Sequence, residues 1–141
     1  MPARSSELAG IFGQLLNLEK YRTLFVDEAS DHLQEMVRAL AALSAGDEPV
    51  TEAVDTLFRM AHSIKGMAAS LDYDSVTRLA HRLEDRMAEW RAQGRVDVPD
   101  GMVLLFRGLE GLERTIHAVA ATGECPPPDT ALLEQLAAKK A

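Results

Sequence analysis

The sequence predicts an all-α protein: an antiparallel, up-down bundle of four long helices with a short fifth helix at its C-terminal end. Apolar residues recur at spacings of 3 and 4 in four long segments, which is the period of amphipathic helices. Glycine and proline gather between these segments, and no run alternates between apolar and polar residues as a strand would. Long amphipathic helices joined by short loops pack as an antiparallel bundle.

The first long helix is predicted over residues 19–44. Residues 1–17 precede it as a lead-in that is either a short helix or partly ordered, so the bundle domain is expected over residues 18–141. Gly46, two acidic residues and Pro49 then end the helix. Its apolar residues follow spacings of 4, 4, 3, 4 and 3: Phe25, Ala29, Leu33, Met36, Leu40 and Leu43.

The second helix is predicted over residues 48–70 and the third over residues 75–93. Asp74, in the polar joint between them, is predicted as the N-cap of the third helix, and Gly94 as its C-terminal stop. The core-facing residues of the two helices are expected to be Val54, Leu57, Phe58, Ala61, Ile64 and Ala68, then Val76, Leu79, Ala80, Leu83, Met87 and Trp90.

The fourth helix is predicted over residues 99–122, and three consecutive prolines at 126–128 stop all helix after it. The fifth, short helix is predicted over residues 129–139. The expected core residues of both are Met102, Leu105, Leu109, Leu112, Ile116 and Val119, then Leu132, Leu133 and Leu136.

Charge and composition exclude several classes of function. The formal net charge of −7 over 141 residues repels phosphate backbones and argues against nucleic-acid binding. Cys125 is the single cysteine, so no disulfide can form within the chain. No apolar run has the length of a membrane span or a signal peptide. We expect a cytoplasmic protein that binds no membrane, no cofactor and no metal.

The segment His62-Ser63-Ile64-Lys65-Gly66 stands out within the second helix. Residues three and four apart share a helix face, so His62, Lys65 and Gly66 form one patch. At about 100° per residue, His62 points more than a quarter-turn from the middle of the apolar stripe, at the boundary or in solvent. A glycine inside a helix costs about 1 kcal/mol relative to alanine, so Gly66 needs a reason. Either access to the imidazole or close helix packing would supply one.

The third helix carries a second polar pair on one face, His81 and Glu84. If the second and third helices are antiparallel neighbours, Glu84 comes close to His62. A carboxylate there accepts the hydrogen of one ring nitrogen and leaves the other with a free lone pair. Such a nitrogen can attack phosphorus, and Lys65 would attract the phosphoryl oxygens as a point charge.

These residues resemble the histidine phosphotransfer (HPt) family, specifically the P1 domain of CheA-type chemotaxis kinases. The stretch from Phe58 to Gly66 is similar to the family's phosphorylation motif, and the segment from Phe25 to Ala29 looks like part of its first helix. His81 and Glu84 stand where the family places a histidine and a carboxylate. The resemblance covers about residues 19–122.

The resemblance implies a role for each site residue. His62 is the phosphorylated residue, Glu84 hydrogen-bonds its ring, Lys65 and His81 assist transfer, and Gly66 gives access. It also implies two protein partners. A separate ATP-binding kinase domain, in the same parent chain or the partner subunit of a dimer, supplies the phosphoryl group, and an aspartate of a response-regulator receiver domain accepts it. The chain itself has no ATP site, so it is no enzyme alone.

Two positions depart from the family pattern. Met67 follows Gly66 where a small residue is usual, and Asp72 stands where glycine is expected. Two other functions stay open. One is a metal-binding bundle that uses His62, His81 and Glu84. The other is an adaptor bundle with an alanine-rich groove for a partner helix, which needs no histidine.

Overall fold

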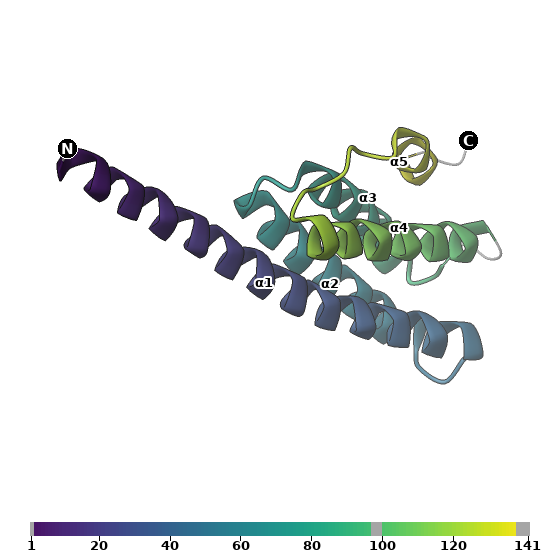
Figure 1. Cartoon of the computed structure of the whole chain (residues 1–141). Helices are drawn as coiled ribbons and strands as arrows, with labels where there is room; N and C mark the ends of the chain where they lie inside the picture. Colours follow the sequence, from purple (N-terminus) through teal and green to yellow (C-terminus); the bar gives the residue numbers. More distant parts are fainter. Residues whose placement is uncertain (1, 97–99, 138–141) are drawn as a thin grey trace.

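The computed structural model describes residues 2–96 and 100–137, and five α-helices account for most of them (Figure 1). They are α1 (Pro2–Ala45), α2 (Val50–Ser70), α3 (Asp74–Gln93), α4 (Asp100–Thr122) and α5 (Thr130–Ala137). The described part of the chain contains no strand. Two predicted boundaries, the start of the fourth helix at residue 99 and the end of the fifth at residue 139, lie outside the described residues.

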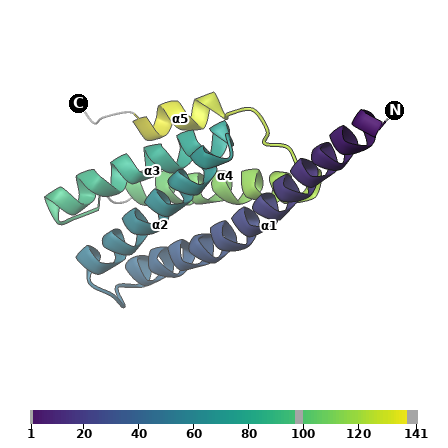
Figure 2. The ribbon, with the colours of Figure 1, turned by 90° about the vertical axis from the view of Figure 1, so that its left-hand side faces the viewer.

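The four long helices form a closed ring of antiparallel neighbours. Helix α1 lies against α2 and α4, and α3 lies against α2 and α4, whereas the backbones of the diagonal pairs do not come close within the described residues. Figure 2 shows α5 lying across α3 and α4, the two helices it contacts. The predicted fold class, a four-helix bundle with a fifth C-terminal helix, is confirmed.

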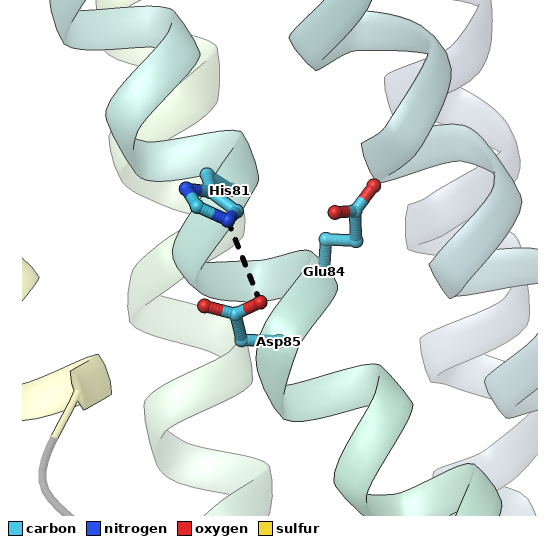
Figure 3. Close-up of side chains that lie close together, drawn as sticks. All are labelled: His81, Glu84 and Asp85. Atoms are coloured by element: carbon cyan, nitrogen blue, oxygen red, sulfur yellow. Dashed lines mark ion pairs between the residues drawn. The ribbon is translucent and has the colours of Figure 1, made fainter.

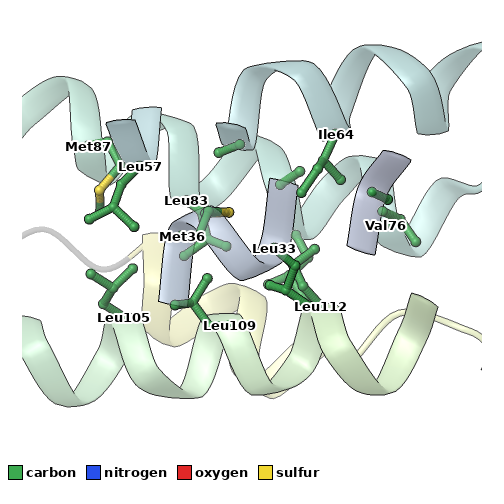
Figure 4. Close-up of a cluster of buried hydrophobic side chains, with 14 of the residues drawn as sticks. Leu33, Met36, Leu57, Ile64, Val76, Leu83, Met87, Leu105, Leu109 and Leu112 are labelled. Atoms are coloured by element: carbon green, nitrogen blue, oxygen red, sulfur yellow. The ribbon is translucent and has the colours of Figure 1, made fainter. Parts of the chain in front are cut away.

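The core consists of the apolar stripes of all five helices. Figure 4 shows the part of it that α1 to α4 form. Met36, Leu57, Leu83 and Leu112 are fully buried at its centre. Of the residues predicted for the core, the ones that lie half-buried at its edge are Leu43, Phe58, Met102 and Leu133. Phe58, Met102 and Leu133 still pack against the buried core.

Two glycines of α4 allow neighbouring helices to approach closely. A Cβ atom at Gly108 would lie 2.5 Å from Cδ2 of Leu83, and one at Gly111 would lie 2.8 Å from Cδ2 of Leu132. The missing side chains therefore leave room for leucines of α3 and α5.

The first helix begins earlier than predicted. Helix α1 starts at Pro2, so the predicted start at residue 19 is wrong, and residues 2–17 continue the same helix. No proline occurs between Pro2 and Pro49, and Gly10 and Gly13 are tolerated inside a helix. Figures 1 and 2 show this N-terminal part of α1 projecting well beyond the other helices.

Helix α2 ends in a Schellman motif that contains an unusual residue. Asp72 has a φ of 59°, the one positive value among the described non-glycine residues. Its N–H donates to the carbonyl of Ala69 at 3.2 Å, and the N–H of Tyr73 donates to Ala68 at 2.9 Å. A left-handed residue is required here, which explains why glycine is expected at this position.

The beginnings of α2 and α3 correct two predictions. Helix α2 starts at Val50 after Pro49, later than residue 48. Tyr73, not Asp74, is the N-cap of α3. The Asp74 carboxylate accepts from Arg78 Nε at 2.9 Å, one helical turn on, so it does not cap the backbone. The predicted stop at Gly94 is confirmed, with a left-handed φ of 69°.

Candidate functional site

The site is built where α2 and α3 lie side by side. His62 on α2 is 64% exposed at its side chain, whereas Glu84 on α3 is only 12% exposed. The Nδ1 atom of His62 is hydrogen-bonded to Oε2 of Glu84. The antiparallel pairing of α2 and α3 therefore brings the two residues together as expected, although 22 positions separate them in the chain.

The ionisation of Glu84 determines which ring nitrogen carries the proton. Burial favours the neutral acid, but hydrogen bonds from Lys65 and His62, together with their charges, outweigh it and lower the pKa of Glu84 below its ordinary value of 4.5. An ionised carboxylate can only accept, so Nδ1 of His62 is the donor. The Nε2 atom of a neutral His62 ring then carries the lone pair.

Lys65 holds the other oxygen of the same carboxylate. Its Nζ lies 2.7 Å from Oε1 of Glu84, and its side chain is 27% exposed. The ammonium of Lys65 and the Nδ1 atom of His62 are therefore bonded to the two oxygens of one carboxylate. Glu84 thus fixes an imidazole and an ammonium group with one carboxylate.

Gly66 lies beside this group and opens onto solvent. A Cβ atom placed on it would meet no heavy atom within 4 Å. Close helix packing, one of the two reasons considered for this glycine, is thereby excluded, in contrast to Gly108 and Gly111. What Gly66 provides is free surface one turn from His62.

Three further residues support His62 and were missed in the sequence. The ring of Phe58 lies nearly parallel to that of His62, at 11° and 6.3 Å between centroids. The guanidinium of Arg91 lies 3.9 Å from the Phe58 ring, and Asp55 accepts from Arg91 at 3.3 Å. The i, i+4 spacing of Phe58 and His62 was a usable signal. The contact of Arg91 with Phe58 depends on the register of α3 against α2, so the sequence carried no signal for it.

Arg59 and His81 are the two other charged or titratable candidates near the site. Arg59 is exposed and donates to Asp55 at 3.0 Å, one helical turn earlier. Figure 3 shows the His81 ring turned toward Asp85, its ion-pair partner at 3.6 Å, with Glu84 directed to the other side. His81 therefore flanks the site without touching the carboxylate.

The geometry offers little to a metal ion. The atoms of His81, Glu84 and Asp85 lie within 4.8 Å of one another (Figure 3). Both oxygens of Glu84 are already bonded, to His62 and to Lys65. A metal held by His62, His81 and Glu84 would have to displace the Lys65 ammonium, so the metal-binding alternative is disfavoured.

Comparison with known proteins identifies the family. The Hpt domain family model matches residues 20–122. The chain belongs to the Hpt domain family. The Chemotaxis protein CheA of Halobacterium salinarum is 33% identical over 122 residues, which are 86% of this chain and 18% of that protein. The CheA of Bacillus subtilis is 29% identical over 109 residues, 77% of this chain and 16% of that protein.

A solved structure shares both fold and sequence with this Hpt domain. It is the phosphorylated P1 domain of CheA3 in complex with CheY6 from R. sphaeroides, with a TM-score of 0.75 and 28% identity. The match covers 83% of this chain and 92% of that one. The chain is thus a phosphotransfer domain of the kind found in CheA, and it spans less than a fifth of the length of the CheA proteins it matches.

None of the described helices is both long enough and apolar enough to cross a membrane.

Proposed function

We propose that His62 is the residue that accepts and donates the phosphoryl group in this Hpt domain. The observation that carries the proposal is the state of its ring. Glu84 holds Nδ1, while the rest of a 64% exposed side chain faces solvent. A neutral imidazole with Nδ1–H engaged has its nucleophilic lone pair on Nε2.

In the first step, the Nε2 lone pair attacks the γ-phosphorus of ATP held by a separate kinase domain. The P–N bond forms, the P–O bond to the ADP leaving group breaks, and no proton leaves the ring. The product ring keeps its Nδ1–H and carries a formal positive charge, which the Glu84 carboxylate stabilises. In the second step, a carboxylate oxygen of a receiver-domain aspartate attacks phosphorus, the P–N bond breaks and the ring returns to neutrality.

The neighbouring residues have supporting roles in this proposal. Lys65 supplies a positive charge beside the transferring group, where phosphoryl transfer depends on electrostatic stabilisation. Gly66 leaves space for the kinase or receiver loop that carries the reacting group. His81 is auxiliary: its ring is near the carboxylate, and its pairing with Asp85 adjusts the charge at the flank of the site.

The proposal extends to the wider protein. Residues 18–141 form the phosphotransfer unit and residues 1–17 precede it. The chain works as part of a multidomain CheA-type kinase in the cytoplasm, where ATP and receiver domains are present, and it supplies no nucleotide site of its own. The CheY partner of the CheA3 P1 domain supports a receiver of that class as the acceptor.

The test is phosphorylation of the chain by a CheA-type kinase domain with radiolabelled ATP. We expect one acid-labile, base-stable label, which His62→Gln removes and an added receiver domain takes up. His117→Gln is the matched control, because His117 is an exposed histidine on α4. Label that persists in His62→Gln, or that is lost in His117→Gln, would overturn the assignment.

A further inference from the structure

The N-terminal part of α1 carries an apolar surface that the bundle does not cover. We call residues 7–24 the overhang, which Figures 1 and 2 show leaving the bundle. Elsewhere among the described residues, large hydrophobic side chains with comparable exposure are Val37, Val103 and Phe106 alone. The overhang has eight, exposed by 47–65%: Leu8, Ile11, Phe12, Leu15, Leu16, Leu18, Tyr21 and Leu24.

This surface continues the face by which α1 enters the core. Leu8, Ile11, Leu15 and Leu18 follow spacings of 3, 4 and 3, and a further step of seven residues leads from Leu18 to the buried Phe25. The helix–helix interface of the bundle therefore extends into the overhang without a partner. Helices in proteins gain most of their stability from the packing of an apolar face, and the bundle leaves this face exposed.

A hollow lies where the overhang leaves the bundle. Its volume is about 520 Å³, and the overhang lines it with Phe12, three leucines, Glu19 and Arg22. The end of the bundle contributes Leu71, Tyr73 and Gly123. The hollow is wide enough for apolar side chains of a second helix laid along α1.

We propose that a second copy of this chain covers the overhang, with the two overhangs antiparallel about a twofold axis. The 3, 4, 3 spacing reads the same in both directions, so an antiparallel partner sets Leu8 opposite Leu18 and Ile11 opposite Leu15. The N-terminal turns of each copy then lie at the base of the other overhang, beside its hollow. Such a contact is self-complementary and closed.

Charge favours a second copy at this place. The overhang holds Glu7, Glu19, Lys20 and Arg22, a net charge of zero, in a chain whose total is −7. Two copies repel each other over most of their surface but not along the overhang. The inference does not depend on the role of His62, and most of the overhang lies before residue 20, where the Hpt family match begins.

The first test is the mass of the full chain in solution by sedimentation equilibrium, from roughly 1 to 200 µM. We expect the mass to rise from 15.4 kDa toward twice that value. Leu15→Glu should keep it at the monomer value, whereas Phe106→Glu, a 50% exposed residue on α4, should leave the dimer intact. Circular dichroism checks that both variants stay helical.

The second test determines the relative orientation of the two overhangs by disulfide crosslinking, in a variant in which Cys125→Ser removes the native cysteine. Gln14→Cys lies near the twofold axis and should form a disulfide with its own copy under mild oxidation, whereas Leu8→Cys should not. A monomer at all concentrations, a dimer that survives Leu15→Glu, or the reverse crosslinking pattern would overturn the proposal. So would a monomer that binds lipid vesicles, or the receiver domain, through Leu15.

Discussion

Lys65 and Glu84 form a 2.7 Å ion pair across α2 and α3, on the carboxylate whose other oxygen holds His62. The ammonium is thus positioned before any phosphoryl group arrives. It also keeps Glu84 ionised, and this ionisation puts the ring proton on Nδ1. In the proposed mechanism, Lys65 would therefore act on the reaction directly through its charge and indirectly through the carboxylate.

Replacing Glu84 by Gln should slow phosphorylation of His62 by roughly 10- to 100-fold, since a hydrogen bond to a charged group is worth about 1.5–3 kcal/mol. The amide no longer stabilises the charge on the phosphorylated ring. Lys65→Ala should slow the phosphorylation of His62 as well. Both variants should keep the helical circular dichroism spectrum. The measurement is the initial rate of labelling by the kinase domain, and unchanged rates in both would show that the site is elsewhere.

The pairing of Glu84 predicts how stability depends on pH. The pKa of Glu84 is lower in the folded chain than its ordinary value of 4.5. The contribution of the Glu84 carboxylate to folding stability is therefore fully present above pH 4.5 and is lost as the pH falls through the folded pKa. Urea denaturation of the wild type and Glu84→Gln should show a stability difference near neutral pH that shrinks toward about pH 3. A difference independent of pH would contradict the ionised pair.

Gly66→Ala should make the domain more stable and less active. The added methyl group meets no atom within 4 Å, and alanine gains about 1 kcal/mol over glycine inside a helix. The same methyl narrows the approach to His62, so the labelling rate should fall. Gly108→Ala is the control, because its Cβ would strike Leu83 at 2.5 Å and should destabilise the fold. Lower stability for Gly66→Ala would show that the glycine has a packing role.

Asp72→Gly should raise the free energy of unfolding by about 0.5–1 kcal/mol. The left-handed φ of 59° strains a residue with a Cβ, and glycine removes that strain. Asp72→Ala should not stabilise, because alanine also has a Cβ and adopts the left-handed region less readily than aspartate does. Urea midpoints of the three proteins check this, and a gain in Asp72→Ala would show that the backbone strain is not the cause.

Phe58→Leu tests whether the stacked ring positions His62. Leucine retains most of the apolar cover but lacks the flat ring that stacks with His62 and lies under the Arg91 guanidinium. We expect slower labelling with a small loss of stability, under about 1.5 kcal/mol. The nuclear magnetic resonance signals of the His62 ring protons should change their chemical shifts, because the aromatic neighbour is lost. Unchanged shifts and rate would assign Phe58 to packing alone.

The sequence by itself predicted the helices and their buried faces, and it singled out His62 as the candidate site residue. The 3 and 4 spacing of apolar residues fixes which face of each helix is buried, because burial on a helix has that period and no other. The same geometry placed His62, Lys65 and Gly66 on one face of α2, since Lys65 and Gly66 follow His62 by three and four residues.

Contacts between helices were decided only by the tertiary structure. Two contacts depend on the axial register of α2 against α3. Glu84 is hydrogen-bonded to both His62 and Lys65, and the Arg91 guanidinium lies over the Phe58 ring. That register follows from how the leucines of the core interlock, which no local spacing encodes. The extent of α1 has a related cause: residues 2–18 follow a helical pattern, but whether anything covers them depends on the rest of the fold.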